Sequence, residues 1–153
     1  MIVVRHAEKT AATDDPPLSD AGQVRARTLA KLLAATKVTR VFTTDYARTR
    51  QTVAPLAEAH GCAPKSYDAR KSDEFAKGLL DLTDGEVVVV AGHSNTVPMM
   101  VRALGGSLTD LDERGYLGED EYDRVVVVTV CGVVGAPRTT TATTLDLRVD
   151  AAG

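Results

Sequence analysis

Short apolar runs alternate with amphipathic stretches along this chain, which is the pattern of an α/β protein. The run EVVVVA at residues 86–91 is apolar at nearly every position, as expected of a strand that is buried on both faces of a parallel sheet. The alternation at residues 141–148 is instead typical of a strand at the edge of a sheet. Strands are predicted at residues 1–4, 38–43, 65–67, 86–91, 124–130 and 141–148.

The amphipathic stretches between these strands predict helices. The first helix follows a turn with the sequence PPLS, and Ser19 or Asp20 can cap its N-terminus. Leu29, Leu32 and Leu33 have helical spacing and predict its buried face. The pattern as a whole predicts a mostly parallel central sheet with helices on both faces, in a single domain over residues 1–153. The predicted helices cover residues 20–36, 47–59, 74–82 and 97–104.

Length, composition and charge exclude several classes of protein for this chain. The 153 residues suffice for one domain with a sizeable core. No apolar run reaches the roughly 20 residues of a membrane span, and the N-terminus lacks the features of a signal peptide, so we expect a cytoplasmic protein without membrane contacts. A formal net charge of −3 and 4% aromatic residues disfavour nucleic acid as a partner. Cys62 and Cys131 predict two free thiols, the second inside an apolar strand.

The stretch at residues 105–123 predicts an acidic loop. Asp110, Asp112 and Glu121 nearly match a calcium-binding loop, but Arg114 stands at a ligand position, where its charge would repel the ion. A strand is predicted after this stretch, whereas a calcium-binding loop of this type leads into a helix. We therefore expect a solvated acidic loop. Where such a loop flanks a pocket, its charge disfavours polyanionic substrates such as nucleotides.

Basic side chains follow three of the predicted strands at the point where each strand ends. Arg5 and His6 come directly after the first strand, and His93 follows EVVVVA. Arg48 lies in the first turn of the helix after the second strand. Ligands of open parallel sheets bind beyond the carboxyl ends of the strands, so we expect these side chains to meet at one rim. Taken singly, each also has an ordinary interpretation: a surface residue for Arg5, a core histidine for His6, a solvated helix residue for Arg48 and a helix cap for His93.

These residue types together favour binding of a dianionic phosphoryl group. One guanidinium group can donate hydrogen bonds to two phosphate oxygens at once. The helix N-termini after Thr44 and His93 add backbone N–H donors and the positive ends of helix dipoles. An imidazole is also a competent nucleophile toward phosphorus. No His, Asp, Glu or Cys cluster has the spacing of a catalytic metal site, so we expect neither a metal nor another cofactor. A nucleotide-binding Rossmann domain is disfavoured because its glycine-rich motifs are missing.

Four segments resemble the histidine phosphatase (phosphoglycerate mutase-like) superfamily, in that family's order. MIVVRHAE at residues 1–8 resembles its first strand and RHG motif, and PLSDAGQ at residues 17–23 resembles its PLTxxGxxQ segment. TDYARTRQT at residues 44–52 is similar to its SxxxRxxQT segment, and VAGHS at residues 90–94 resembles its second-histidine motif. The resemblance implies a phosphoglycerate mutase-like fold.

The resemblance also implies roles for the residues that follow the strands. His6 is then the nucleophile that becomes phosphorylated. Arg5, Arg48 and His93 bind the phosphoryl group, together with Ser94. Phosphate or sulfate is therefore the ligand that we expect in the pocket.

The chain departs from the family pattern at several positions. Ala7 stands where glycine is usual, and Thr44 stands where serine is commoner. Many members have a carboxylate general acid between the third strand and the second histidine, and this region is short here. For two of the candidate acids the alternative is capping of the helix that starts there. The candidates are Asp68, Asp73 and Glu74, the last two being the possible caps.

The same short region leaves no residues for a sizeable cap over the site. In this the chain looks like the small phosphohistidine phosphatase (SixA-like) branch. The function implied is a metal-independent phosphatase that hydrolyses phosphate monoesters or protein phosphohistidine through a covalent phosphohistidine. Its substrate would be a phosphorylated small molecule or a phosphoprotein. Two alternatives are a phosphoglycerate mutase-type phosphotransferase, which must enclose its intermediate, and a non-enzymatic phosphate-binding protein.

Overall fold

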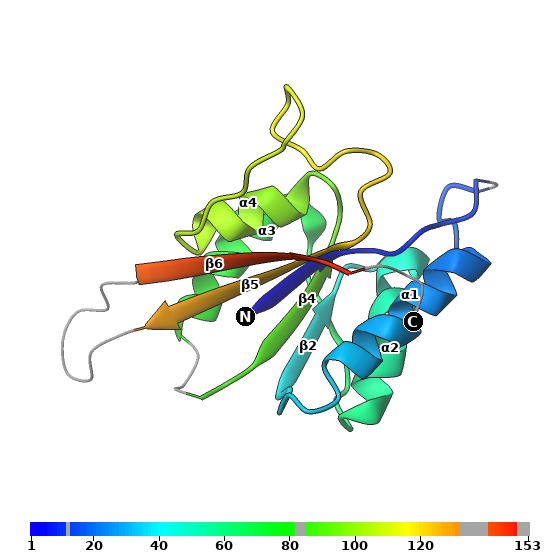
Figure 1. Ribbon diagram of the computed structural model, residues 1–153, viewed down its shortest axis with the longest axis horizontal. Helices are drawn as coiled ribbons and strands as arrows, with labels where there is room; N and C mark the ends of the chain where they lie inside the picture. The colour runs from blue at the N-terminus through cyan, green and yellow to red at the C-terminus, as the bar shows by residue number, and fades with distance from the viewer. Residues whose placement is uncertain (12, 82–84, 132–140, 150–153) are drawn as a thin grey trace.

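The computed structural model of the protein describes residues 1–11, 13–81, 85–131 and 141–149. Within these residues one sheet has the strand order β3-β2-β4-β1-β5-β6 (Figure 1). The pairs β3–β2, β2–β4 and β4–β1 are parallel, while β5 runs antiparallel to both of its neighbours. The predicted mostly parallel sheet is thus confirmed. The strands are β1 (Ile2–Arg5), β2 (Arg40–Thr43), β3 (Lys65–Ser66), β4 (Val88–Gly92), β5 (Arg124–Cys131) and β6 (Thr141–Arg148).

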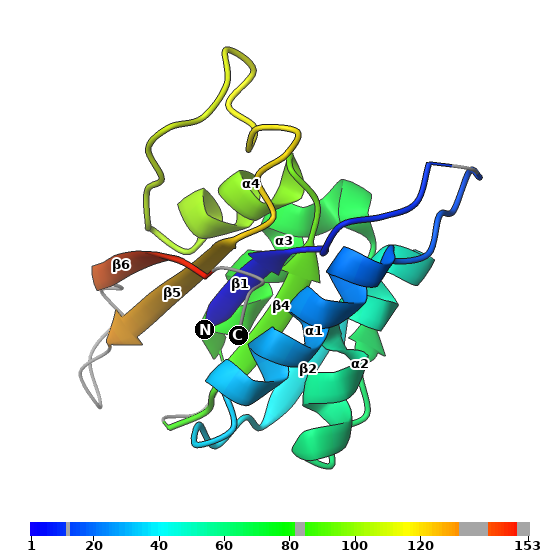
Figure 2. The same ribbon diagram turned by 45° about the vertical axis from the view of Figure 1, so that its right-hand side comes forward.

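Helices cover both faces of this sheet, as predicted (Figure 2). One pair packs together on one face and the other pair on the opposite face. The first pair is α1 (Asp20–Leu32) and α2 (Ala47–Ala59), and the second is α3 (Ser72–Gly78) and α4 (Thr96–Ala103). Ser19 caps α1, its side chain accepting a hydrogen bond from Gly22 N at 3.2 Å, as the sequence predicts. None of the helices described is long and apolar enough to cross a membrane.

Alternate residues of the central strands fill the two layers of the core. Val3 and Val90 pack with the apolar side chains of α3 and α4. Val4 and Val89 point to the opposite face and pack with α1 and α2. All four are at most 3% exposed, so β1 and β4 are buried on both faces and lie rigidly in the middle of the sheet.

The structure corrects three details of the sequence prediction. Helix α1 ends at Leu32 rather than near residue 36, and Leu32 is 47% exposed. Leu29 and Leu33 share one helical face, whereas Leu32 lies about 100° around the helix from Leu33 and faces away from the core. Helix α3 starts at Ser72 and gives way after Gly78 to a 3₁₀ turn, and the predicted end at residue 82 lies outside the described residues. Cys131 ends β5 and is exposed.

The segment of residues 105–123 contains no helix or strand and arches over the carboxyl end of β1 and β4 (Figures 1 and 2). Some of its acidic side chains have partners within the protein: Asp112 pairs with Arg114, and the Glu121 carboxylate contacts Arg124. Among the described residues, no group of three or more His, Cys, Asp or Glu is arranged to hold a metal ion. This loop flanks the site described next.

Candidate active site

The pairing of β1 with β4 brings the two histidines together. Arg5 lies opposite Gly92 in the parallel register, so the residues that follow them leave the sheet side by side. His6 N donates to Gly92 O at 2.9 Å, and the imidazole centroids of His6 and His93 are 5.5 Å apart. Because of this register, the two imidazoles lie at the same rim of the sheet, as the sequence predicted.

The His6 imidazole is buried and neutral. Its Nδ1 lies 2.8 Å from Ala7 O, and because a carbonyl can only accept, Nδ1 carries the proton. The lone pair of the neutral ring is therefore on Nε2. His6 is 4% exposed, and this burial lowers its pKa to about 3, with the charge of Arg5 and nearby His93 acting in the same direction.

The His93 imidazole has the opposite tautomer. Thr49 Oγ1 donates its single hydrogen to Tyr46 O at 2.9 Å. In its contact with Thr44 Oγ1, at 2.7 Å, Thr49 Oγ1 is therefore the acceptor. Thr44 Oγ1 in turn accepts from His93 Nε2 at 3.0 Å, which leaves the lone pair of His93 on Nδ1. Burial, together with the charges of Arg48 and Arg5, lowers the pKa of His93 to about 4. Thr44 thus retains, with its hydroxyl, the contact that a serine could make.

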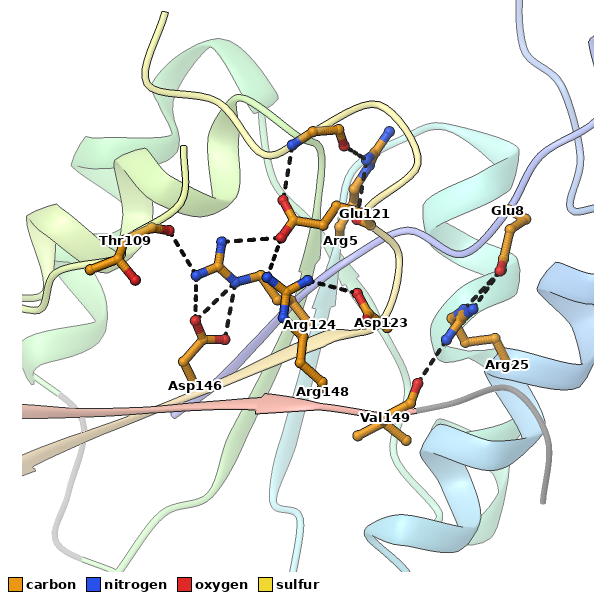
Figure 3. A network of polar contacts seen from close by, with 11 residues as sticks. Arg5, Glu8, Arg25, Thr109, Glu121, Asp123, Arg124, Asp146, Arg148 and Val149 are labelled. Carbon is orange, nitrogen blue, oxygen red and sulfur yellow. Dashed lines mark hydrogen bonds and ion pairs between the residues drawn. The ribbon is translucent and has the colours of Figure 1, made fainter. Parts of the chain in front are cut away.

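Arg5 ends β1 and turns its guanidinium under the acidic loop. Its Nη1 donates to Gly118 O at 2.6 Å and to Glu121 O at 3.1 Å (Figure 3). The guanidinium carbon lies 4.2 Å from the centroid of the Tyr122 ring, which also stands 5.9 Å from the His6 ring. A cation over an aromatic face at this distance is attracted to it. Nothing in the sequence pattern indicated that Tyr122 would reach the site.

Arg48 approaches from the first turn of α2. Its guanidinium carbon lies 4.3 Å from the centroid of Tyr46, and the Tyr46 ring stands 5.3 Å from that of His93. Asp15 contacts Arg48 Nη1 at 3.7 Å and accepts from Ala47 N at 2.8 Å, so its carboxylate already caps α2. The predicted free donors at this helix N-terminus are thus partly used by Asp15, which the sequence analysis did not single out.

Other residues of the segments that resemble the family fix the backbone that follows His6. Ala7 N donates to Thr52 Oγ1 at 2.9 Å, and Leu18 N donates to Gln51 Oε1 at 2.7 Å. A Cβ added at Gly22 would lie 2.1 Å from Glu8 O, so only glycine lets α1 approach this segment. Two side chains of α2 that follow Arg48 therefore hold the backbone next to His6 and at Leu18.

Ser94 and Gly92 flank His93 on its own segment. Ser94 lies in the turn between β4 and α4, and its carbonyl accepts from Leu117 N at 3.0 Å, which ties this turn to the acidic loop. A Cβ at Gly92 would lie 2.7 Å from Thr96 Oγ1, the atom that accepts from His93 N. Glycine before His93 thus allows the close packing that orients the start of α4.

Among the described contacts, none joins the three candidate acids to either imidazole. Asp68 is exposed and accepts from Arg70 N at 2.9 Å, a hydrogen bond that lowers the pKa of its carboxyl. A carboxyl with a lowered pKa is a poor proton donor at neutral pH. Asp73 and Glu74 lie in the first turn of α3, where the helix dipole favours them, but the capping position is Lys71. Lys71 is therefore the N-cap residue of α3, and the interpretation of Asp73 and Glu74 as caps was wrong.

Comparison with known proteins agrees with the sequence resemblance. The sequence model of the histidine phosphatase superfamily (branch 1) matches residues 1–73. Among curated proteins, none has significant sequence similarity to the chain. The protein histidine phosphatase SixA complexed with tungstate superposes with a TM-score of 0.66 at 18% identity, over 96% of this chain and 95% of that one. YhfR of Bacillus stearothermophilus gives a TM-score of 0.70 at 15% identity, over 92% and 93% of the two chains. A Nakamurella multipartitia protein described as a SixA phosphohistidine phosphatase gives a TM-score of 0.64 at 20% identity, over 97% of this chain and 95% of that one.

Fold and geometry thus define an α/β protein of the phosphoglycerate mutase-like class, with paired imidazoles beyond the carboxyl ends of β1 and β4. The predicted resemblance to the histidine phosphatase superfamily is confirmed by sequence over residues 1–73. Over most of the chain, the comparison with solved structures shows the same fold. Proteins named SixA are among those that share this fold.

Proposed function

We propose that the protein is a phosphatase that hydrolyses phosphate monoesters or protein phosphohistidine through a phosphohistidine formed on His6, without a metal ion. The superfamily match supports a phosphatase in the broad sense. The observation that carries the finer proposal is the pair of neutral imidazoles, 5.5 Å apart, whose pKa values are lowered by burial and, to a smaller extent, by the charges of Arg5 and Arg48.

The first step uses the lone pair on His6 Nε2. This atom attacks phosphorus, and the bond from phosphorus to the leaving oxygen or nitrogen breaks with its electron pair on the leaving group, which takes up a proton. Arg5 and Arg48 stabilise the charge that spreads over the phosphoryl oxygens, together with His93 and Ser94. In the second step water attacks the phosphohistidine, which releases inorganic phosphate and restores the neutral imidazole.

Buried donors at the site support binding of an anion. The Nε atoms of Arg5 and Arg48 are both buried, and neither has a hydrogen-bond partner among the described residues. A buried guanidinium N–H without an acceptor is costly, and phosphoryl oxygens are the acceptors that suit it best. The described part of the chain adds no separate cap domain at this rim of the sheet, which supports a substrate as large as a phosphorylated side chain on another protein.

The substitution His6→Ala tests the proposal. It should abolish hydrolysis of p-nitrophenyl phosphate and also the acid-labile labelling of the protein by a phosphoryl donor. His60→Ala is the matched control, because His60 ends α2 about 20 Å from its first turn. The control should be labelled like the wild type. Labelling that persists in the His6 variant, or wild-type turnover with no labelled protein, would contradict the covalent mechanism.

A further inference from the structure

Arg5 is held by one short turn of the loop at residues 105–123. Its Nη1 carries two hydrogens, and Gly118 O and Glu121 O accept both of them. The guanidinium retains its Nε–H and the two Nη2 hydrogens for a ligand, with Nε buried and unpartnered among the described residues. Nε and Nη2 form the edge that binds two oxygens of an anion side by side. The two carbonyls therefore decide which edge of Arg5 is left for a ligand.

The Glu121 side chain closes this turn (Figure 3). Its Oε2 accepts from Gly118 N at 2.9 Å, and Glu121 N donates to Gly118 O at 3.1 Å. The same two residues that are joined in this way supply both carbonyls to Arg5. Without the carboxylate, one hydrogen bond of the turn would remain, and the carbonyl positions would be less defined.

Two arginines fix the Glu121 carboxylate in turn. Its Oε1 lies 3.4 Å from Arg124 Nη1 and also pairs with Arg148. Arg124 is 1% exposed, and its Nε binds both carboxylate oxygens of Asp146 at 3.1 and 2.9 Å (Figure 3). A buried guanidinium with several partners has little freedom to move, because each displacement would strand a desolvated charge. The position of Glu121 is therefore determined by β5 and β6.

We propose that Glu121 is a positioning residue for Arg5. It acts through the turn at Gly118 and does not touch the substrate. This inference rests on the proposed function, in which Arg5 binds the phosphoryl group. It extends the site from the first 94 residues to the C-terminal strand pair, since β6 supplies Arg148.

Glu121→Ala and Asp146→Asn separate positioning from simple stability. Both variants take a carboxylate charge from the buried Arg124, but only Glu121 closes the turn that holds Arg5, and asparagine at position 146 keeps an oxygen that can accept from Arg124 and so leaves Glu121 in place. Binding of orthovanadate, measured by titration calorimetry, should weaken at least about tenfold in Glu121→Ala and by less than about threefold in Asp146→Asn. The KM for p-nitrophenyl phosphate should rise in the first variant and not in the second, although both have lower thermal midpoints. In the Arg5→Ala background, Glu121→Ala should weaken binding no further.

Unchanged orthovanadate binding in Glu121→Ala, or equal losses in the two variants, would overturn the positioning role. If Arg5→Ala itself bound orthovanadate like the wild type, the proposed function would fail instead. Should Glu121→Ala not fold, Glu121→Gln takes its place. An amide can accept at only one of the two places where the carboxylate accepts, so it should also bind orthovanadate more weakly than Asp146→Asn does. An affinity equal to that of Asp146→Asn would count against the proposal.

Discussion

The two buried imidazoles predict that acid destabilises the protein well above the pH at which carboxylates titrate. In the unfolded chain a histidine has a pKa near 6.5, whereas burial lowers the pKa to about 3 for His6 and about 4 for His93. Between these values the unfolded chain binds more protons than the folded protein. The free energy of unfolding is therefore unaffected above about pH 7, starts to fall as the pH drops through 6.5, and stops falling near the folded-state values.

The magnitude follows from the size of these shifts. Each histidine lowers the free energy of unfolding by about 1.4 kcal/mol per pH unit inside its window. Between pH 7 and pH 5 this amounts to about 2 kcal/mol for each ring and about 4 kcal/mol for both. Such a loss is a large fraction of the roughly 5–15 kcal/mol by which a domain is stable.

Urea unfolding followed by far-ultraviolet circular dichroism at both pH values measures this loss. His6→Asn and His93→Asn each remove one titrating ring, so each should reduce the acid-induced loss by about half, and the double variant should remove most of it. Carboxyls with lowered pKa, such as those of Glu8 and Asp112, are present in every variant and cancel in the comparison. An acid-induced loss of equal size in the wild type and the double variant would refute the reasoning.

Three further outcomes test the site. Arg48→Ala should lower kcat/KM for p-nitrophenyl phosphate by about 100-fold, whereas Arg102→Ala, on the exposed side of α4, should change it by less than about threefold; equal effects would rule out a special role for Arg48. Activity should survive exhaustive dialysis against EDTA, and a loss that one metal restores would show that the reaction needs that metal. In a reaction without a carboxylic general acid, kcat/KM should fall steeply as the leaving group becomes more basic, and no carboxyl-to-amide variant should affect aryl phosphates much. If kcat/KM depends little on leaving-group basicity in the wild type and steeply in one variant, that variant identifies the acid; the variants are Asp68→Asn, Asp73→Asn and Glu74→Gln.

The sequence predicts the elements that local pattern determines. Helix α2 has the predicted bounds, and the central strand β4 is as fully buried as its apolar run indicates. The meeting of His6 with His93 was also predictable, because parallel strands place their carboxyl ends at one edge. Helix ends were less predictable: α1 ends at Leu32, and the apolar spacing did not show that Leu32 would be exposed while Leu33 is buried.

The partners of the site residues were not predictable in the same way. Tyr122 and Glu121 lie in a polar segment without periodicity, so nothing local indicates which of its side chains turn inward. Their contacts with Arg5 span more than 110 residues and depend on how the loop crosses the sheet edge. Asp15 caps α2 from a loop 32 residues earlier, and a carboxylate in such a loop has no sequence signal that separates it from its neighbours.

The central place of β1 has a consequence for the order in which the chain folds. Residues 2–5 are made before every other strand of this sheet, yet they pair with residues 89–92 on one side and with residues 125–127 on the other. During synthesis the first strand must therefore wait for most of the chain before either of its edges is satisfied. Such distant pairings slow folding and leave strand edges exposed meanwhile. His6 and Arg5 thus gain their final surroundings only when β5 docks, so a chain that stops before residue 124 would contain both histidines and still lack the formed site.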